Sequence, residues 1–147
     1  MRFLDEIAEL DNEHIVGRYT WTVADCAGHF PDFPIVPGVK IIECAAQTGC
    51  VAWGLYHLSH VRPVDEIKHC VGCFTSVDGA SFKRALRPGD EVEATARFGE
   101  EGYFRGNKIC AEVSVRLKQS GDEVFSGLLC GVWMPREIAE RYGGIAG

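Results

Sequence analysis

One long segment with few charges constrains the fold of this chain more than any other feature. The residues from Gly38 to Leu58, GVKIIECAAQTGCVAWGLYHL, contain no proline and are apolar on most faces, and Pro37 stands just ahead of them. Proline is favoured in the first turn of a helix, and at 1.5 Å per residue the segment predicts a helix of about 30 Å. A helix that is apolar nearly all round must be enclosed by other elements.

In the second half of the chain, apolar and polar residues alternate as they do in strands with one buried and one solvent-exposed face. Apolar and polar residues alternate over 91–98 and over 107–117, which predicts two such strands. The residues expected to face inward are Val92, Ala94, Ala96, Phe98, Ile109, Ala111, Val113, Val115 and Leu117. A turn at 119–122 leads into the apolar run 123–134, which predicts a central strand.

Three further elements are expected around these. The segments 14–21 and 68–77 read as strands before and after the long helix, and 135–141 reads as a short terminal helix closed by Gly143 and Gly144. Strands that follow one another along the chain are antiparallel by default. The sequence therefore predicts an α+β fold in which an antiparallel sheet wraps one central helix.

Composition limits the classes of protein that this chain can belong to. Its 147 residues show no repeat or linker and predict a single domain over 1–147. The formal net charge of −6 argues against nucleic acid as a partner. The longest charge-free apolar run, 44–58, is short for a membrane span, and the acidic start of the chain is unlike a signal peptide. We expect a cytoplasmic protein without a membrane partner.

Seven cysteines are spread along the chain without a dense framework. They are interpreted as reduced, mostly buried apolar residues. One alternative is a zinc site built from a cluster of histidines and cysteines, which comprises His57, His60, His69, Cys70 and Cys73. Because residues three apart on a strand point to opposite faces, Cys70 and Cys73 do not form the usual paired ligands. No metal is therefore expected at these residues, and we expect no organic cofactor either.

The residues that indicate chemistry lie just before and inside the long helix. The loop HFPDFPIVPG (29–38) carries His29 and is stiffened by three prolines. It leads into a helix start whose amides lack partners, with Glu43 little more than one turn inside. This arrangement suits acid–base chemistry beside a developing oxyanion. Glu43 stands in an otherwise apolar stretch and requires hydrogen bonds or a function, and Gln47, four residues on, can orient it.

The stretch 29–47, HFPDFPIVPGVKIIECAAQ, resembles the signature H-F-P-G-x-P-x-x-P-G-V-L-x-x-E-x-x-A-Q of the (3R)-hydroxyacyl-acyl-carrier-protein dehydratases. These are the FabZ type within the hotdog fold superfamily, to which the FabA type is related. A second stretch, VDGASFKR (77–84) followed by RPGD (87–90), is similar to the family's I-D-x-A-x-F-K-R-P-V-x-P-G-D. The resemblance extends from about Phe3 to Met134.

The resemblance implies a role for each matching residue. His29 is expected to remove the α-proton of a 3-hydroxyacyl thioester, and Glu43 of the partner subunit to protonate the departing hydroxyl. The backbone N–H of Gly38 is expected to hold the thioester oxygen, and Gln47 to support Glu43. The related dehydratase-isomerases place Asp where this chain has Glu43, so the resemblance favours dehydration without double-bond migration.

The resemblance also implies binding surfaces and partners. The residues assigned to the substrate are Phe30, Pro37, Val39 and Phe82. Lys83, Arg84 and Arg87 are assigned to docking of an acidic carrier protein, with an ordinary wet surface as the alternative. The family implies a thioester substrate on acyl-carrier protein or coenzyme A, in fatty-acid or polyketide and polyene biosynthesis. It also implies a homodimer, or a trimer of dimers, with sites shared between subunits.

Two positions depart from the family pattern. Asp32 stands where the family usually has Gly, and is expected to tolerate the left-handed backbone of a turn. Lys40 stands where the family usually has Leu, and either pairs with Glu43 or points to solvent or a carrier phosphate. Two alternatives to a dehydratase stay open. One is a hotdog thioesterase, and the other, which these two departures favour, is a catalytically weakened member that binds acyl thioesters or acts as a partner subunit.

Overall fold

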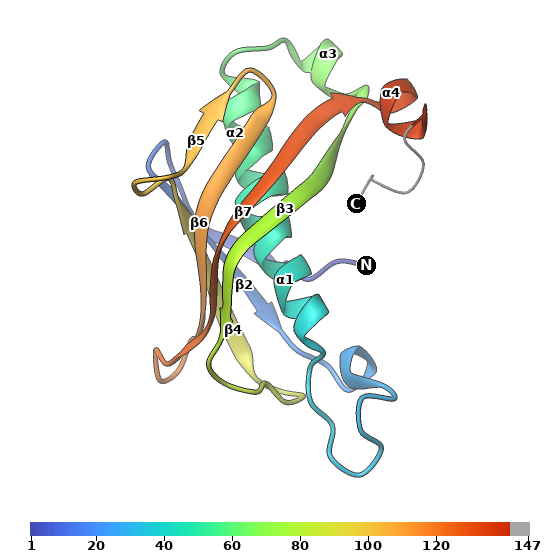
Figure 1. Ribbon diagram of the computed structural model, residues 1–147, viewed down its shortest axis with the longest axis vertical. Helices are drawn as coiled ribbons and strands as arrows, with labels where there is room; N and C mark the ends of the chain where they lie inside the picture. The colour runs from blue at the N-terminus through green and yellow to red at the C-terminus, as the bar shows by residue number, and fades with distance from the viewer. Residues whose placement is uncertain (142–147) are drawn as a thin grey trace.

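The computed structural model describes residues 1–141, in which seven antiparallel strands form one sheet that curves around a central helix (Figure 1). The strand order is β1-β2-β4-β6-β7-β3, and β5 pairs with β6. The strands are β1 (Glu6–Leu10), β2 (His14–Thr20), β3 (Cys70–Phe82), β4 (Glu91–Arg97), β5 (Tyr103–Arg105), β6 (Lys108–Leu117) and β7 (Glu123–Pro135). The predicted α+β class and wrapped helix are confirmed.

The central helix consists of three consecutive parts. These are α1 (Gly38–Ala46), a π-helical turn η2 (Gln47–Ala52) and α2 (Trp53–Ser59). The predicted helix over 38–58 is therefore confirmed within one residue at its end, but its middle departs from α geometry. The loop before α1 projects at one end of the molecule, and the short helices α3 (Val64–Ile67) and α4 (Arg136–Arg141) lie near the other end (Figure 1).

The sheet presents its small and β-branched residues to the helix, as the alternation predicts. Every predicted inward residue is buried except Phe98 and Leu117, which are partly buried against the same core. The helix approaches the sheet closely at Gly49, where a Cβ would lie 2.7 Å from Val113 Cγ2 and 3.3 Å from Ala96 Cβ. A larger residue at this position has no room without displacing the sheet.

Several elements differ from the sequence prediction. β3 runs on to Phe82, beyond the expected end at 77, because it pairs with β7 along its whole length. Four elements were not expected from the sequence, namely β1, β5, α3 and the 3-10 turn η1 (Ala24–Cys26). Each is short or exposed on both faces, so its apolar and polar residues do not alternate in a way that predicts a helix or strand. Gly143, Gly144 and the predicted domain end at 147 lie outside the described residues.

The expectation that the cysteines are all reduced is wrong at one pair. Cys110 on β6 and Cys130 on β7 are direct cross-strand partners, with their Cα atoms 4.1 Å apart, and they form a disulfide. They are 20 residues apart in the sequence, and only the register of the two strands brings their sulfurs together. The other five cysteines are free, and among them Cys70 alone is not fully buried.

Thiol counting is expected to reproduce this distribution. Ellman's reagent should label about one thiol per native chain, since Cys70 is the accessible free cysteine. Unfolding without reductant should expose five thiols, and unfolding with reductant all seven. Seven thiols in the unreduced, unfolded chain would contradict the disulfide. The variant Cys70→Ser is the control, because it should lose the native signal and retain the bound pair.

Within residues 1–141, no helix combines the length and apolarity that crossing a membrane requires.

Candidate active site

The loop that carries His29 is folded back on itself by a pair of bonds to Ile35. The backbone N–H of Ile35 donates to the His29 carbonyl at 3.3 Å, and His29 Nδ1 lies 3.2 Å from the Ile35 carbonyl oxygen. A carbonyl oxygen only accepts hydrogen bonds, so Nδ1 carries the hydrogen. In the neutral imidazole, Nε2 therefore has its lone pair available and is the nitrogen that can act as a base.

Phe30, next to His29, has an unusual backbone conformation. Its φ is 59°, and among the described residues it is the one non-glycine residue in the left-handed region. Asp32 is not in the left-handed region, because that conformation occurs two residues earlier, so its expected tolerance of such a backbone stays a prediction. The Phe30 ring lies 4.5 Å from the His29 ring, centroid to centroid. Strained backbone of this kind is concentrated at functional sites in proteins.

Lys40 ties the His29 loop to the central helix. Its Nζ donates to the Asp25 carbonyl oxygen at 2.7 Å, so it neither pairs with Glu43 nor points freely to solvent. The Asp25 carboxylate accepts from the Tyr19 hydroxyl at 2.7 Å. Partial burial acts to raise the pKa of Asp25, but the hydrogen bonds from Tyr19 and Thr22 and the Lys40 charge hold it below its ordinary value. The segment before His29 is thus fixed from two sides.

Removing the Lys40 bond is expected to loosen this loop. In Lys40→Met, amide exchange over 26–35 should accelerate by about tenfold, because a hydrogen bond from a charged donor stabilises by about 1.5 kcal/mol. Hydrogen exchange followed by mass spectrometry measures this, with the strands β6 and β7 as the internal reference. Lys40→Arg retains a charged donor and should remain closer to the wild type. Equal exchange rates in Lys40→Met and the wild type would contradict the role.

Gly38 begins α1, and Phe82 covers it. A Cβ at Gly38 would lie 3.3 Å from the Phe82 ring, so the absence of a side chain lets the ring pack against the helix start. The first amides of a helix have no intrahelical partner, and the helix dipole makes this end attractive to negative charge. Val39 beside it is 74% exposed, and Pro37 is the N-cap residue. The structure therefore brings together three of the four predicted substrate-binding residues, Pro37, Val39 and Phe82.

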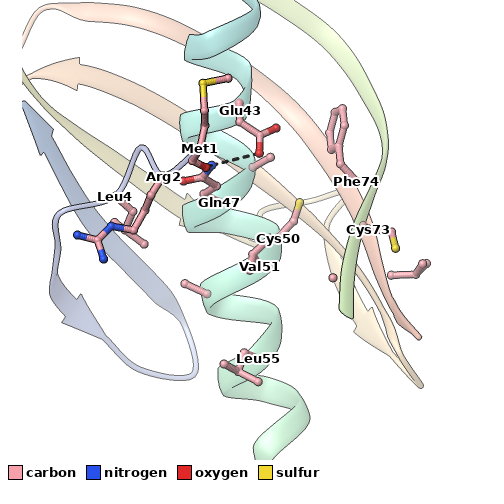
Figure 2. A pocket seen from close by; sticks show the side chains of 15 residues that line it. Met1, Arg2, Leu4, Glu43, Gln47, Cys50, Val51, Leu55, Cys73 and Phe74 are labelled. Carbon is pink, nitrogen blue, oxygen red and sulfur yellow. Dashed lines mark hydrogen bonds between the residues drawn. The ribbon is translucent and has the colours of Figure 1, made fainter. Parts of the chain in front are cut away.

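Glu43 and Gln47 lie on one face of the central helix and are hydrogen-bonded, as their spacing predicts. Gln47 Nε2 donates to Glu43 Oε1 at 3.1 Å, and both side chains are partly buried (Figure 2). The same amide also contacts the first residues of the chain, which sequence reasoning missed. Phe3 N donates to Gln47 Oε1 at 2.6 Å, and Gln47 Nε2 also donates to the Met1 carbonyl oxygen at 2.9 Å.

Glu43 borders an apolar cavity of about 410 Å³ between the central helix and the strands β3 and β7 (Figure 2). Its wall comprises Met1, Arg2, Leu4, Glu43, Ala46, Gln47, Cys50, Val51, Ala52, Leu55, Gly72, Cys73, Phe74, Gly131 and Val132. Burial raises the pKa of the Cys50 thiol to about 12 and also raises that of Cys73. Both thiols therefore stay protonated at neutral pH, where they are poor nucleophiles. His29 is not among the wall residues of its own chain.

Ion pairs occupy two of the three residues predicted to dock a carrier protein. Lys83 Nζ lies 3.0 Å from Glu123 Oε2, and Arg84 lies 2.6 Å from Asp122. Arg87 instead stacks over the ring of Phe33, at 4.8 Å, and so contacts the loop of His29. All three side chains are exposed. Their docking role stays a prediction.

The residues of the zinc alternative are dispersed. Across residues 1–141, no three His, Cys, Asp or Glu side chains gather as ligands for a metal ion. His57 packs among Trp53, Phe98 and Phe104, and burial lowers its pKa. Cys70 Sγ lies 3.5 Å from the Glu66 carbonyl oxygen.

An antiparallel sheet wrapped around one central helix defines the hotdog class of proteins, and this chain has that fold. Solved structures share this fold. A dehydratase heterocomplex, ApeI:P, from Xenorhabdus doucetiae matches with a TM-score of 0.73 and 15% identity, over 97% of this chain and 90% of that one. A thioesterase superfamily member from Thermus thermophilus matches with a TM-score of 0.63 and 16% identity, over 92% and 91%.

The model of the ApeI-like dehydratases matches residues 20–116, and the chain belongs to this family. Curated relatives agree. A 3-hydroxyacyl-[acyl-carrier-protein] dehydratase FabZ from Streptococcus pyogenes is 33% identical over 129 residues, which cover 86% of this chain and 87% of the relative. The FabZ of Polynucleobacter asymbioticus is 44% identical over 80 residues, 53% of this chain and 48% of that protein. The chain is thereby placed among the hydro-lyases.

Proposed function

We propose that this chain dehydrates (3R)-3-hydroxyacyl thioesters to trans-2-enoyl thioesters. The observation that carries the proposal is Glu43, a carboxylate at the wall of an apolar cavity, with one oxygen held by Gln47. An acyl chain fits such a cavity, because ligand sites of this kind are mostly apolar with a few placed polar groups. The FabZ relatives are dehydratases by name, which supports the same reaction here.

The proposed reaction assigns one step to each polar group. His29 Nε2 takes the α-proton, and the electron pair moves toward the thioester carbonyl. The N–H of Gly38 stabilises the enolate-like oxygen, aided by the dipole of the helix. The C3–O bond then breaks, and Glu43 of the partner subunit supplies the proton that lets the hydroxyl leave as water. The products are one water and the enoyl thioester, and no cofactor takes part.

The carrier and the assembly complete the proposal. The thioester is carried on acyl-carrier protein, with coenzyme A as the alternative, and the reaction serves fatty-acid biosynthesis or a polyketide or polyene pathway in the cytoplasm. The chain acts as a homodimer or a trimer of dimers. Two observations favour a shared site. His29 does not line the cavity that Glu43 of its own chain lines, and Val39 in the first turn of α1 and Phe30 in the His29 loop both expose apolar side chains.

One assay distinguishes this function from its alternatives. The protein is incubated with crotonyl and 3-hydroxybutyryl thioesters of acyl-carrier protein and of coenzyme A, and then with longer chains. Enoyl absorbance and free thiol are followed together. Hydration or dehydration without release of thiol is expected. Release of thiol would overturn the proposal in favour of a thioesterase, and silence in both signals at every chain length would favour a binding protein.

A further inference from the structure

The first residues of the chain form a strap over the catalytic face of the central helix. The N-terminal strap, Met1–Leu4, passes Gln47 and continues into β1. Phe3 anchors it, since this side chain is 2% exposed and its ring lies 5.6 Å from that of Tyr19 and 5.3 Å from that of Trp21. Met1 and Leu4 also line the cavity that Glu43 borders, and Figure 2 shows Met1 beside Glu43.

Two backbone groups of the strap determine which way the Gln47 amide faces. The Phe3 N–H can only donate, so the atom that it contacts at 2.6 Å must be the amide oxygen of Gln47. The Met1 carbonyl can only accept, so the atom 2.9 Å from it must be the amide nitrogen. A flipped amide would place oxygen against a carbonyl oxygen and nitrogen against an N–H group. The orientation is therefore fixed from outside the helix.

The fixed orientation decides what Glu43 receives. Because Gln47 Oε1 is taken by the Phe3 N–H, the group left to face Glu43 is an amide N–H, which donates to Oε1 at 3.1 Å. An oxygen that accepts this bond is the less favourable place for an acid proton. A protonated Glu43 then carries its hydrogen on Oε2, the oxygen that Gln47 does not contact.

We propose that the N-terminal strap positions Glu43 for catalysis, acting through Gln47, and assigns the acid proton to Oε2. Phe3 and Gln47 are positioning residues in this scheme, since neither donates a proton to the substrate. We call the two hydrogen bonds from Phe3 to Gln47 and from Gln47 to Glu43 the relay. The expected effect of the relay on kcat rests on the proposed function, whereas the hydrogen bonds themselves can be measured without any activity.

Kinetic measurements test the relay with two kinds of variant. Phe3→Ala removes the anchor of the strap, and Gln47→Glu keeps an acceptor for the Phe3 N–H but loses the donor to Glu43. Each should lower kcat for dehydration by about 10- to 100-fold with KM changed by less than about twofold, because misplacement of a catalytic group acts on the chemical step. Phe3→Leu retains an apolar anchor and is the matched control, expected to remain within about threefold of the wild type.

A double-mutant cycle separates the relay from loss of packing. If the strap acts through Gln47, Phe3→Ala should cost little further kcat once Gln47 is already alanine. A double variant whose loss of kcat equals the product of the two single losses would overturn the proposal. Gln47→Glu leaves the anchor of the strap untouched, so it tests the same relay even where Phe3→Ala does not fold.

An amide signal provides the readout without activity. In ¹⁵N-labelled protein, the Gln47 side-chain resonance, assigned by its loss in Gln47→Ala, should show slowed proton exchange in the wild type and faster exchange in Phe3→Ala. Unchanged exchange in a folded Phe3→Ala would overturn the strap. If the wild type dehydrates no thioester while this exchange result holds, the proposed function fails and the relay stands.

Discussion

Replacing His29 with alanine, or Glu43 with glutamine, is expected to lower the rate of dehydration by about 10²- to 10⁴-fold, the usual contribution of a positioned acid or base. His29→Ala removes the Nε2 lone pair, and Glu43→Gln keeps the shape of the side chain while removing the proton donor. Both residues lie at partly exposed positions, so the fold should be retained. The rates are measured with 3-hydroxybutyryl thioester, with circular dichroism as the check on folding. A folded variant with more than half of the wild-type rate would remove that residue from the mechanism.

Mixing the two inactive variants tests the shared site. If each site uses His29 from one subunit and Glu43 from the other, a mixed dimer has one intact site and one doubly altered site. Random exchange of subunits should then restore about a quarter of the wild-type activity, by the symmetry of a dimer. Mixing under conditions without subunit exchange is the control. No recovery after demonstrated exchange would place both groups in the same chain.

The largest effect on stability is expected at Trp53. This side chain is fully buried at the start of α2, stacks on Phe98 at 4.3 Å and donates from Nε1 to the Asp11 carbonyl at 3.0 Å. Trp53→Ala removes all of these contacts and leaves a cavity, at a cost of about 3–5 kcal/mol. Domains of this size are typically stable by about 5–15 kcal/mol, so the variant should unfold at a much lower urea concentration.

Two further variants serve as controls for the unfolding of Trp53→Ala. Trp53→Phe keeps the aromatic stacking but loses the hydrogen bond, and should be intermediate between the wild type and Trp53→Ala. Val61→Ala, at a residue that is 66% exposed, should change the free energy of unfolding by less than about 0.5 kcal/mol. A loss below about 1 kcal/mol in Trp53→Ala would show that the aromatic cluster around α2 contributes little.

The elements that sequence reasoning predicted are those whose burial is periodic. The strands 91–97 and 108–117 each bury one face, and the helix from Gly38 buries most faces. The order of apolar and polar residues in the sequence therefore shows which elements these segments form. β1 is an edge strand with four of its five residues exposed and a register shift after Ile7, and its sequence shows no such alternation. The pairing of β3 with β7 joins segments about fifty residues apart, and no local turn indicates it.

In the candidate site too, the sequence predicts contacts between residues at a regular spacing and misses contacts between distant segments. The Glu43–Gln47 hydrogen bond depends on a spacing of four along one helix, so the sequence reveals it. The bond from Phe3 to Gln47 spans 44 residues, and the bond from Lys40 to Asp25 ends on a backbone carbonyl, which any residue type would offer. Contacts of this kind depend on the folded path of the chain, and no residue pattern marks them in advance.

The π-helical turn η2 affects how the cavity-lining side chains of the central helix are aligned. In a regular α-helix, each step of four residues advances by about 40° around the axis, so three steps turn a row of side chains by about 120°. Here Glu43, Gln47, Val51 and Leu55 are spaced by four and all line the same cavity. In the wider turn at 47–52, the step from Gln47 to Val51 falls short of a full turn, which opposes the drift of the other two steps. The row of four side chains therefore turns much less than a regular α-helix would turn it over the same length of about 18 Å, and an acyl chain bound as proposed would run along the helix instead of winding around it.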